Sequence, residues 1–328
     1  MRTFENKLSV ALVVAFFAVL LSGIFPVESR AAEYPERPIT LIVPYLAGGI
    51  TDLSARVLAE SMSRHLKQPV LVMNRPGAGG TIGGNIIATA VPDGYTLGFL
   101  PLGAAVPEAF KFDYESRYSS TDLAAIASVA GTTMTFAVKA DSPLQSMKDV
   151  VELARKSGSL LIGTSGKFTL PAMIIMNIAA KEGVKIDDVP FASDANTLPA
   201  LLGGHIAVGT ISYASMRPSV EVGKIRVLAI CDENRADFVP NAPTMLELGY
   251  EMPYVSALGL FGPKGLPEAL VKKLSDLVAT IAKDPQFIGR MREMSIPVAF
   301  KDSAAYQKAV FRDRDKLIAF FKRQGLLK

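Results

Sequence analysis

The chain of 328 residues has a formal net charge of +4, one cysteine, two histidines and no tryptophan. A single cysteine excludes an intramolecular disulfide, and a chain of this length can bury a core without one. Eight Lys or Arg against three Asp or Glu lie between positions 301 and 328, so the rest of the chain is close to neutral. This composition, with no series of stacking aromatic residues, disfavours nucleic acid as a partner.

Residues 1–32 have the pattern of a secretory signal peptide. Positive charges precede an apolar run over residues 8–25, and small residues follow at 29–32. The run is nearly long enough to cross a bilayer, so a membrane-anchoring helix is the alternative. The small residues favour cleavage after Ala31 or Ala32. We therefore predict an exported protein that is located in the periplasm.

After this segment, short apolar runs alternate with segments of helical periodicity. This alternation predicts α/β layers with mostly parallel sheets. In chain order we expect strands at 40–43, 70–73, 96–100, 160–163, 188–191, 206–210, 227–230 and 258–261, and helices at 51–66, 81–90, 170–182, 196–202 and 304–324.

The length of the mature chain suits two domains. We expect the chain to cross between them in the runs 134–139 and 255–262. One domain would then comprise residues 33–135 together with 255–328. The other would comprise residues 136–254.

Two glycine-bearing loops, at residues 44–52 and 74–84, each follow a short apolar strand and precede a helix. A helix that begins at such a turn leaves its first backbone N–H groups unpaired. These groups and the positive end of the helix dipole favour an anion. The turns at 163–167 and 191–196 repeat the pattern in the second half. Four such turns on two α/β units predict two domains that face one anionic ligand.

Other readings of these loops are weaker. The pair Gly77 and Gly79 lacks the spacing of a dinucleotide-binding motif. Ser165 lies in a turn that resembles a nucleophile elbow, but G-x-S-x-G is not matched and no His–acid pair is placed to serve it. His65 and His205 have no partner at metal-ligand spacing. We therefore expect no catalytic residue, no metal and no cofactor.

Short motifs along the mature chain resemble the periplasmic solute receptors of tripartite tricarboxylate transporters, also called Bug receptors. The match runs in order through the whole mature chain. It comprises residues 34–39 (YPERPI), 43–45 (VPY), 47–49 (AGG), 51–52 (TD), 74–80 (NRPGAGG), 82–83 (IG), 92–97 (PDGYTL), 163–166 (GTSG), 189–191 (VPF), 201–204 (LLGG), 223–229 (GKIRVLA), 242–244 (APT) and 259–263 (GLFGP).

The resemblance implies a two-domain α/β periplasmic binding protein of type II, which closes like a Venus flytrap about a hinge of two crossing strands. It implies a receptor, not an enzyme, that binds a small organic carboxylate and delivers it to the permease subunits of a tripartite tricarboxylate transporter. We expect a monomer. The alternatives are a sensor that presents its closed state to a membrane signalling partner, and a carboxylate-processing hydrolase with Asp52 or Asp194 as its base.

In such receptors, backbone N–H groups and ordered waters hold the ligand carboxylate. The matching residues of this chain are the expected ligand-binding residues. They are Tyr45, Ala47, Gly48, Asp52, Ala78, Gly79, Gly80 and Thr81 in the first domain, and Thr164, Ser165, Gly166, Lys167, Ser193 and Asp194 in the second.

The chain departs from the family pattern at Lys167, Asp194 and Ala207. Lys167 is able to hold a second carboxylate if it points inward. Asp194 either accepts a hydrogen bond from an amine or hydroxyl of the ligand or caps the helix expected at 196–202, and its position favours the cap. Asp52 either orders the ligand or complements the dipole of its helix. These departures indicate a changed ligand or a receptor that no longer serves transport.

Overall fold

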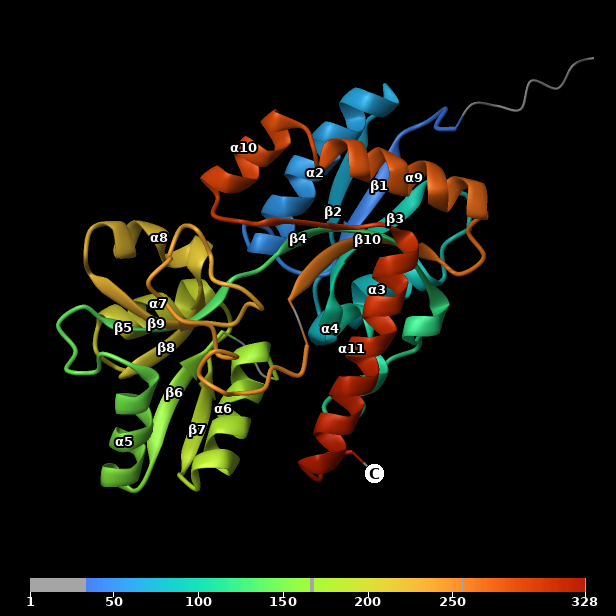
Figure 1. Cartoon of the computed structure of the whole chain (residues 1–328). Coiled ribbons are helices and arrows are strands. Elements are labelled where there is room, and N and C mark those ends of the chain that lie inside the picture. The colour runs from blue at the N-terminus through green and yellow to red at the C-terminus, as the bar shows by residue number, and fades with distance from the viewer. Residues whose placement is uncertain (1–33, 166–167, 255, 328) are drawn as a thin grey trace, which may run out of the picture. The chain divides into compact units, whose positions relative to one another are not determined.

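The structure is a computed structural model that describes residues 34–165, 168–254 and 256–327 (Figure 1). The predicted signal peptide lies outside the described residues, as do Gly166 and Lys167 of the expected site. In the part of the chain that is described, no helix is both long enough and apolar enough to cross a membrane.

Two mixed sheets organise the fold. The first has six strands in the order β11-β4-β10-β3-β1-β2, and the second has five in the order β7-β6-β8-β5-β9. The strands are β1 (Ile39–Val43), β2 (Val70–Asn74), β3 (Thr96–Pro101), β4 (Leu123–Gly131), β5 (Met134–Lys139), β6 (Leu160–Thr164), β7 (Ile186–Pro190), β8 (Val208–Ser212), β9 (Ile225–Ile230), β10 (Ala257–Pro263) and β11 (Val298–Lys301).

Helices connect most of these strands. They are α2 (Ile50–Leu66), α3 (Thr81–Ala88), α4 (Leu102–Ala105), α5 (Met147–Ser157), α6 (Leu170–Glu182), α7 (Asp194–Leu202), α8 (Tyr213–Glu221), α9 (Glu268–Ile281), α10 (Pro285–Glu293) and α11 (Ser303–Arg323), with the short 3-10 turns η1 (Ala78–Gly80), η2 (Pro107–Phe110) and η3 (Ser120–Asp122). Every expected strand and helix is present, with ends displaced by no more than two residues.

The expectation of mostly parallel sheets is wrong. The pairs β1–β2, β1–β3, β6–β7 and β6–β8 are parallel, whereas β10 and β5 run antiparallel to both of their neighbours. The chain enters β5 directly from β4 of the first sheet, and it enters β10 after leaving the second sheet. A strand that arrives from the other sheet has no crossover helix to set it parallel to its neighbour.

We call the first sheet and its helices the first lobe, and the second sheet and its helices the second lobe. The described strands of the first lobe come from residues 39–131 and 257–301, and those of the second lobe from 134–230. The chain thus passes between the sheets after β4 and after β9. The domain boundaries at 135/136 and 254/255 stay a prediction.

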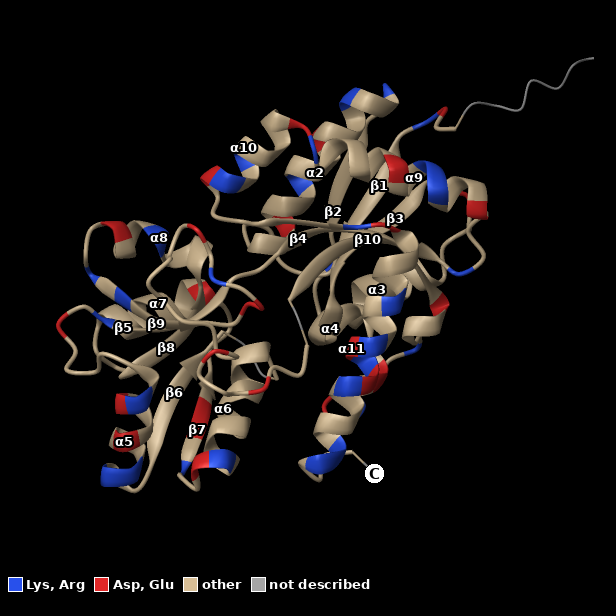
Figure 2. Ribbon diagram, in the orientation of Figure 1, with Lys and Arg blue, Asp and Glu red and all other residues tan. Residues whose placement is uncertain are grey.

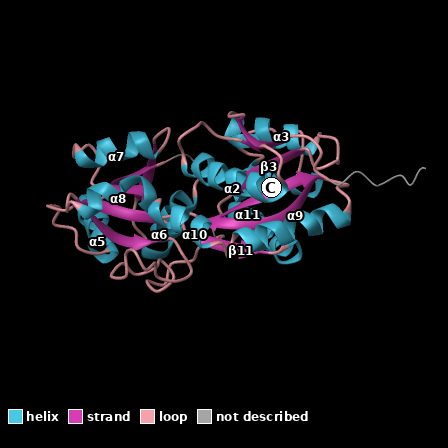
Figure 3. Cartoon of the chain, turned by 90° about the horizontal axis from the view of Figure 1, so that it is seen from above, coloured by secondary structure: helices cyan, strands magenta, loops and turns pink. Residues whose placement is uncertain are grey.

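Helices cover both faces of each sheet (Figure 3). In the first lobe, α2 packs on β1, β2 and β3 and against α9 and α10, while α3 packs on β1, β3 and β10. Apolar residues of α11 share a buried cluster with Ile87 of α3. In the second lobe, α5 and α6 bury their apolar residues with Val208 of β8, whereas α7 and α8 bury theirs with Ile211 of the same strand. Val208 and Ile211, an odd number of residues apart on β8, thus face opposite sides of the sheet.

Local signals in the sequence set several helix ends. At the start of α5, Ser146 and Asp149 form a capping box, and Gly158 ends the helix in the left-handed conformation. In α6 a proline lies in the first turn, and Gly183 provides the left-handed end. Asp284 accepts from the N–H of Gln286 at the start of α10.

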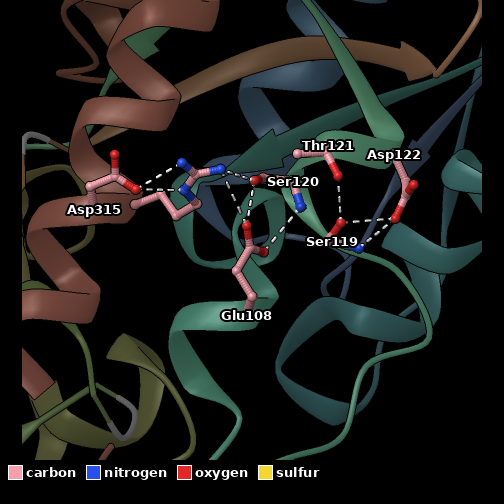
Figure 4. Close-up of polar contacts among 7 residues, drawn as sticks. Glu108, Ser119, Ser120, Thr121, Asp122 and Asp315 are labelled. Atoms are coloured by element: carbon pink, nitrogen blue, oxygen red, sulfur yellow. Dashed lines mark hydrogen bonds and ion pairs between the residues drawn. The ribbon is translucent and has the colours of Figure 1, made fainter. Parts of the chain in front are cut away.

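The long helix α11 carries both basic and acidic side chains (Figure 2). Its Arg314 lies 22% exposed and donates to the hydroxyl of Ser120 at 3.3 Å. Glu108 accepts from the backbone N–H of Ser120 at 3.0 Å and from its hydroxyl, as Figure 4 shows. These contacts fix α11 to the 3-10 turns η2 and η3.

The apolar side of α11 is held by aromatic packing. Phe321 is fully buried, and its ring lies 5.4 Å from the ring of Phe110 and 4.7 Å from that of Phe112. Removing a buried phenylalanine ring leaves a cavity and costs about 3–5 kcal/mol.

We therefore predict that Phe321→Ala lowers the free energy of unfolding by about 3–5 kcal/mol, measured by urea unfolding followed by circular dichroism. Phe300→Ala is the matched control, because Phe300 on β11 is 36% exposed. An equal loss of unfolding free energy in both variants would contradict the placement of Phe321 in the core.

Candidate functional site

The first loop of the candidate site follows β1, and the second follows β2. Because β1 and β2 are parallel neighbours, with Val43 beside Asn74, both loops begin at the same edge of the sheet. This carboxyl edge is where open α/β sheets bind their ligands. Ala47 and Gly48 of the first loop are exposed to solvent, and α2 begins shortly after them, at Ile50.

Asp52 lies in the first turn of α2 and is 1% exposed. Its carboxylate accepts from the backbone N–H of Gly48 at 2.9 Å, from the side-chain amide of Asn74 at 2.9 Å, and from Nε and Nη2 of Arg56 at 2.9 Å each. All of these donors belong to the protein. Asp52 therefore holds the first loop in place, and we assign it to positioning.

The environment of Asp52 acts on its pKa in two directions. Burial raises the pKa, but the hydrogen bonds from Arg56, Gly48 and Asn74 and the charge of Arg56 outweigh burial, so the pKa is lowered. The carboxylate is thus ionised at neutral pH. This is the form that can accept all four hydrogen bonds.

Asn74 and Tyr45 tie the first loop to the second. The amide of Asn74 also donates to the carbonyl of Tyr45 at 3.0 Å, and the Tyr45 hydroxyl donates to the carbonyl of Gly79 at 3.4 Å. Burial raises the pKa of Tyr45 to about 12, so this hydroxyl keeps its proton. The two loops are therefore parts of one hydrogen-bonded unit.

The second loop has an unusual backbone. Gly77, Ala78, Gly79 and Gly80 all have positive φ, at 129°, 46°, 63° and 98°. Glycine adopts such angles without steric cost, which is why three of the four positions are glycine. A Cβ at Gly80 would also lie 3.0 Å from that of Ala104. The loop is therefore a left-handed turn that favours glycine at these positions.

The left-handed turn exposes backbone donors. The N–H of Gly80 donates to Gly77, and both the N–H and the hydroxyl of Thr81 donate to Ala78, the hydroxyl at 2.8 Å. Among the described residues, no acceptor is found for the N–H groups of Ala78 and Gly79. Groups of this kind, beside the start of a helix, suit an anion, and the anion site at Ala78 and Gly79 stays a prediction.

The expected residues of the second lobe lie where β6 ends. Thr164 is fully buried, and its hydroxyl donates to Asp188 at 3.1 Å. The Ser165 hydroxyl lies 3.0 Å from that of Thr197 and donates to the carbonyl of Thr210 at 3.1 Å. No histidine contacts the Ser165 hydroxyl among the described residues, so the geometry of a nucleophile elbow is not formed there.

The interpretation of Asp194 as the cap of a helix at 196–202 is wrong. The helix α7 begins at Asp194 itself, and Ser193 is its N-cap residue. The Asp194 carboxylate instead accepts from Ser212, through the backbone N–H at 3.2 Å and the hydroxyl at 2.5 Å, and from the Ser215 hydroxyl at 2.8 Å. Ser212 caps α8, so Asp194 stabilises the start of the next helix.

Among the described residues, the hydrogen bonds of Ser193 stay within its own turn. Its hydroxyl donates to the side-chain carbonyl of Asn196 at 3.0 Å. Ser193 is exposed at the same edge of the second sheet as Thr164 and Ser165. Apart from Gly166 and Lys167, which lie outside the described residues, the expected residues of each half thus lie at the carboxyl edge of one sheet.

The sequence interpretation missed Arg56 and Asn74 in the first lobe and Ser212 and Ser215 in the second. Asn74 ends a strand of apolar residues, and a polar residue there is a signal that could have been used. Arg56 follows Asp52 by one helical turn, which is the spacing of an ion pair. The serines at 212 and 215 have the spacing of a helix cap.

The residues to which the sequence assigns no role in the site have ordinary structural surroundings. The Nδ1–H of His65, late in α2, donates to the carbonyl of Ser61 at 2.8 Å. Cys231 is fully buried, and burial raises the pKa of its thiol well above the usual value. In the described ranges, no three His, Cys, Asp or Glu side chains gather as a metal site.

The sequence model of the family described as "Tripartite tricarboxylate transporter family receptor" matches residues 54–326 of this chain. The chain belongs to this family. The match covers both lobes, from α2 to the end of α11. The resemblance found from the short motifs is thereby confirmed.

Known relatives agree with this assignment. A protein of Cupriavidus necator named "UPF0065 protein in gbd 5'region" is 32% identical over 318 residues, which cover 96% of each chain. The solved structure of the periplasmic binding protein BugD is 30% identical, with a TM-score of 0.73, and covers 90% of this chain and 100% of that one. A Polaromonas TctC solute-binding protein is 29% identical, with a TM-score of 0.73 and coverage of 88% and 99%.

These comparisons confirm the two-domain α/β fold of a periplasmic binding protein. Members of the receptor family are periplasmic solute-binding proteins. The chain is therefore a solute-binding receptor and not an enzyme.

The hydrogen bonds to Asp52 should make the free energy of unfolding depend on pH. A carboxyl whose pKa is lowered by folding stabilises the protein above its unfolded pKa of about 4, and this contribution is lost as the pH falls through the folded value. Asp52→Asn should therefore lower the free energy of unfolding at pH 7 by about 1–3 kcal/mol.

The difference between the Asp52→Asn variant and the unchanged protein should shrink as the pH falls below about 4. Urea unfolding at a series of pH values measures it. Asp187→Asn is the control, because Asp187 is exposed on β7. A difference that stays constant down to the acid limit would contradict the ionised, hydrogen-bonded Asp52.

Proposed function

We propose that this protein is a periplasmic receptor that binds a small organic carboxylate between its two lobes and delivers it to the membrane subunits of a tripartite tricarboxylate transporter. The N–H groups of Ala78 and Gly79, which have no described acceptor, carry the proposal. They lie in a left-handed turn that is tied to the first loop by Tyr45. Such a turn suits a carboxylate because it offers fixed donors without a counter-charge.

Backbone donors can supply enough affinity. Micromolar binding requires about 8 kcal/mol. A hydrogen bond to a charged group contributes about 1.5–3 kcal/mol, and a helix N-terminus about 0.3–1 kcal/mol. Several bonds from the loops of both lobes reach this value after the cost of association. No arginine in the site is therefore needed.

A relative supports the ligand class. An R. palustris protein whose structure was solved with adipate is 26% identical to this chain, with a TM-score of 0.79, and covers 89% of this chain and 99% of that one. We infer that this chain also binds an acid of this general kind. The proposed contacts are made by Tyr45, Ala47, Gly48, Ala78, Gly79, Gly80 and Thr81 in the first lobe and by Thr164, Ser165, Ser193 and Asp194 in the second.

The place of the protein in the cell follows from its N-terminal sequence. We infer that residues 1–32 direct export and are removed, so that the mature receptor acts as a monomer in the periplasm. Uptake of the bound acid by intact cells should then depend on this chain and on the permease. Normal uptake in its absence would contradict the delivery step.

We predict that small carboxylates stabilise the mature protein against heat and that their primary amides do not. A ligand at 100 times its Kd adds about 2.7 kcal/mol of stability, which raises Tm by several degrees. Thermal unfolding against aliphatic and aromatic acids measures this. If no acid shifts Tm more than its amide does, the receptor function is contradicted.

We also predict that Thr81→Val weakens binding of the best acid about tenfold, a change of about 1.4 kcal/mol. The hydroxyl of Thr81 fixes the carbonyl of Ala78 and so the direction of the neighbouring N–H groups. Thr89→Val is the matched control, because it removes the same kind of bond, from Thr89 to the carbonyl of Asn85 at 2.8 Å, at the far end of α3. Equal affinities in calorimetry would contradict the role of this turn.

A further inference from the structure

The segment between η2 and η3 carries a tyrosine whose ring is held by the fold but whose hydroxyl is not. The backbone N–H of Tyr114 donates to the carbonyl of Phe110 at 3.2 Å. The two rings stack, with their centroids 5.9 Å apart and 13° between their planes. Tyr114 is partly buried, and no described residue forms a hydrogen bond with its hydroxyl. A phenylalanine would make the same ring contacts, so packing does not explain the hydroxyl.

The ring of Tyr114 lies directly against the second glycine loop. A Cβ on Gly79 would lie 2.7 Å from Cε1 and 3.1 Å from Cζ of this ring, and the first of these distances is closer than Cβ atoms approach in proteins. The absence of a side chain at Gly79 therefore permits the contact. The hydroxyl oxygen is bonded to Cζ, so it lies beside the backbone of Gly79. The hydroxyl of Tyr114 is thus next to the turn that carries the N–H groups of Ala78 and Gly79.

Two tyrosines from different segments meet at this turn. The Tyr45 hydroxyl is engaged, because it donates to the carbonyl of Gly79. Burial raises the pKa of Tyr114, and the neighbouring Tyr45, Asp113 and Glu108 raise it further. The Tyr114 hydroxyl therefore keeps its proton at neutral pH and is a donor.

Other tyrosines of the described chain show what a structural hydroxyl looks like. The hydroxyls of Tyr118, Tyr213 and Tyr250 donate to the carbonyl of Ala104, to the carbonyl of Phe238 and to the carboxylate of Glu182. This is the usual arrangement for a tyrosine that packs in a protein. The Tyr306 hydroxyl also has no partner in the described structure, but Tyr306 is 2% exposed and lies in the core. Tyr114 differs because it is only partly buried and lies at the candidate site.

The surroundings of this hydroxyl are compatible with an anion. Of the two acids that act on Tyr114, Asp113 is exposed to solvent, and Glu108 is paired with Arg314 at 3.9 Å. Water and the paired cation therefore weaken their repulsion of an anion. A carboxylate has lone pairs for about four hydrogen bonds, so it can accept a phenol O–H in addition to two backbone N–H groups.

We propose that Tyr114 is a further ligand-binding residue, whose hydroxyl donates to the carboxylate that the N–H groups of Ala78 and Gly79 hold. This inference rests on the proposed function, because it concerns the ligand of the same site. A donor to the carboxylate contributes to the binding of every acid, whatever the rest of the ligand is. Tyr114 therefore sets affinity for the acid group and does not select among acids.

The test is Tyr114→Phe, which removes the hydroxyl and keeps the ring. Calorimetry with succinate, adipate, benzoate and 4-hydroxybenzoate compares acids that share a carboxylate and differ elsewhere. Each acid that binds the unchanged protein should bind the variant about tenfold more weakly, because a hydrogen bond to an ionised group is lost. The Tm of the variant without ligand should be unchanged, because the hydroxyl has no described protein partner.

Tyr250→Phe is the matched control. It removes a hydroxyl that donates to Glu182 at 3.1 Å in the second lobe, beyond the carboxyl end of α6. This variant should show the opposite pattern, with a lower Tm in the absence of ligand and an unchanged affinity for each acid. The two variants together separate a hydroxyl that binds the ligand from one that stabilises the fold.

The outcomes distinguish this inference from the receptor function. Equal affinities of Tyr114→Phe and the unchanged protein, or a loss confined to some of the acids that bind, would overturn the inference and leave the receptor function intact. Failure of all four acids to bind the unchanged protein would contradict the receptor function itself.

A second measurement does not depend on the folding of the variant. The chain has nine tyrosines, and labelling their Cζ atoms with ¹³C makes each phenol visible by nuclear magnetic resonance. Addition of an acid that binds should shift two of these resonances, those of Tyr45 and Tyr114. A shift of one resonance or of none would overturn the inference.

Discussion

The candidate site depends on one buried carboxylate. Asp52 binds Gly48 in the first loop, Asn74 at the start of the second and Arg56 on its own helix, and each hydrogen bond involves an ionised group. A buried charge is tolerated only when it is paired and fully hydrogen-bonded. Because Asp52 meets this condition through both loops, the loops cannot move independently. The start of the loop that carries Ala78 and Gly79 is anchored in this way.

The two lobes present different chemical groups at the carboxyl edges of their sheets. The first presents backbone N–H groups from a glycine turn, and we propose that these groups hold the carboxylate of the ligand. The second presents hydroxyls and the carboxylate of Asp194, which are among the proposed contacts to the rest of the ligand.

Much of this arrangement could be predicted from the sequence, since the strand–helix alternation and the glycine loops are local signals. The antiparallel direction of β5 and β10 could not be predicted from the sequence, because it depends on how the chain passes between the two sheets. Asp194 fits a cap by position alone, and only the packing of α8 beside α7 reveals its partners. The role of Asp52 was left open for the same reason, because Asn74 comes to it from another strand. Contacts within one turn can be read from sequence, whereas contacts between elements require the fold.

The central claim is that the N–H groups of Ala78 and Gly79 hold the carboxylate of the ligand. Nuclear magnetic resonance of the ¹⁵N-labelled protein, with and without the acid that stabilises it most, tests this directly. We expect the amide protons of these two residues to move downfield and to exchange more slowly with water when the acid is bound. An acid that binds tightly and leaves both resonances and both exchange rates unchanged would contradict the account.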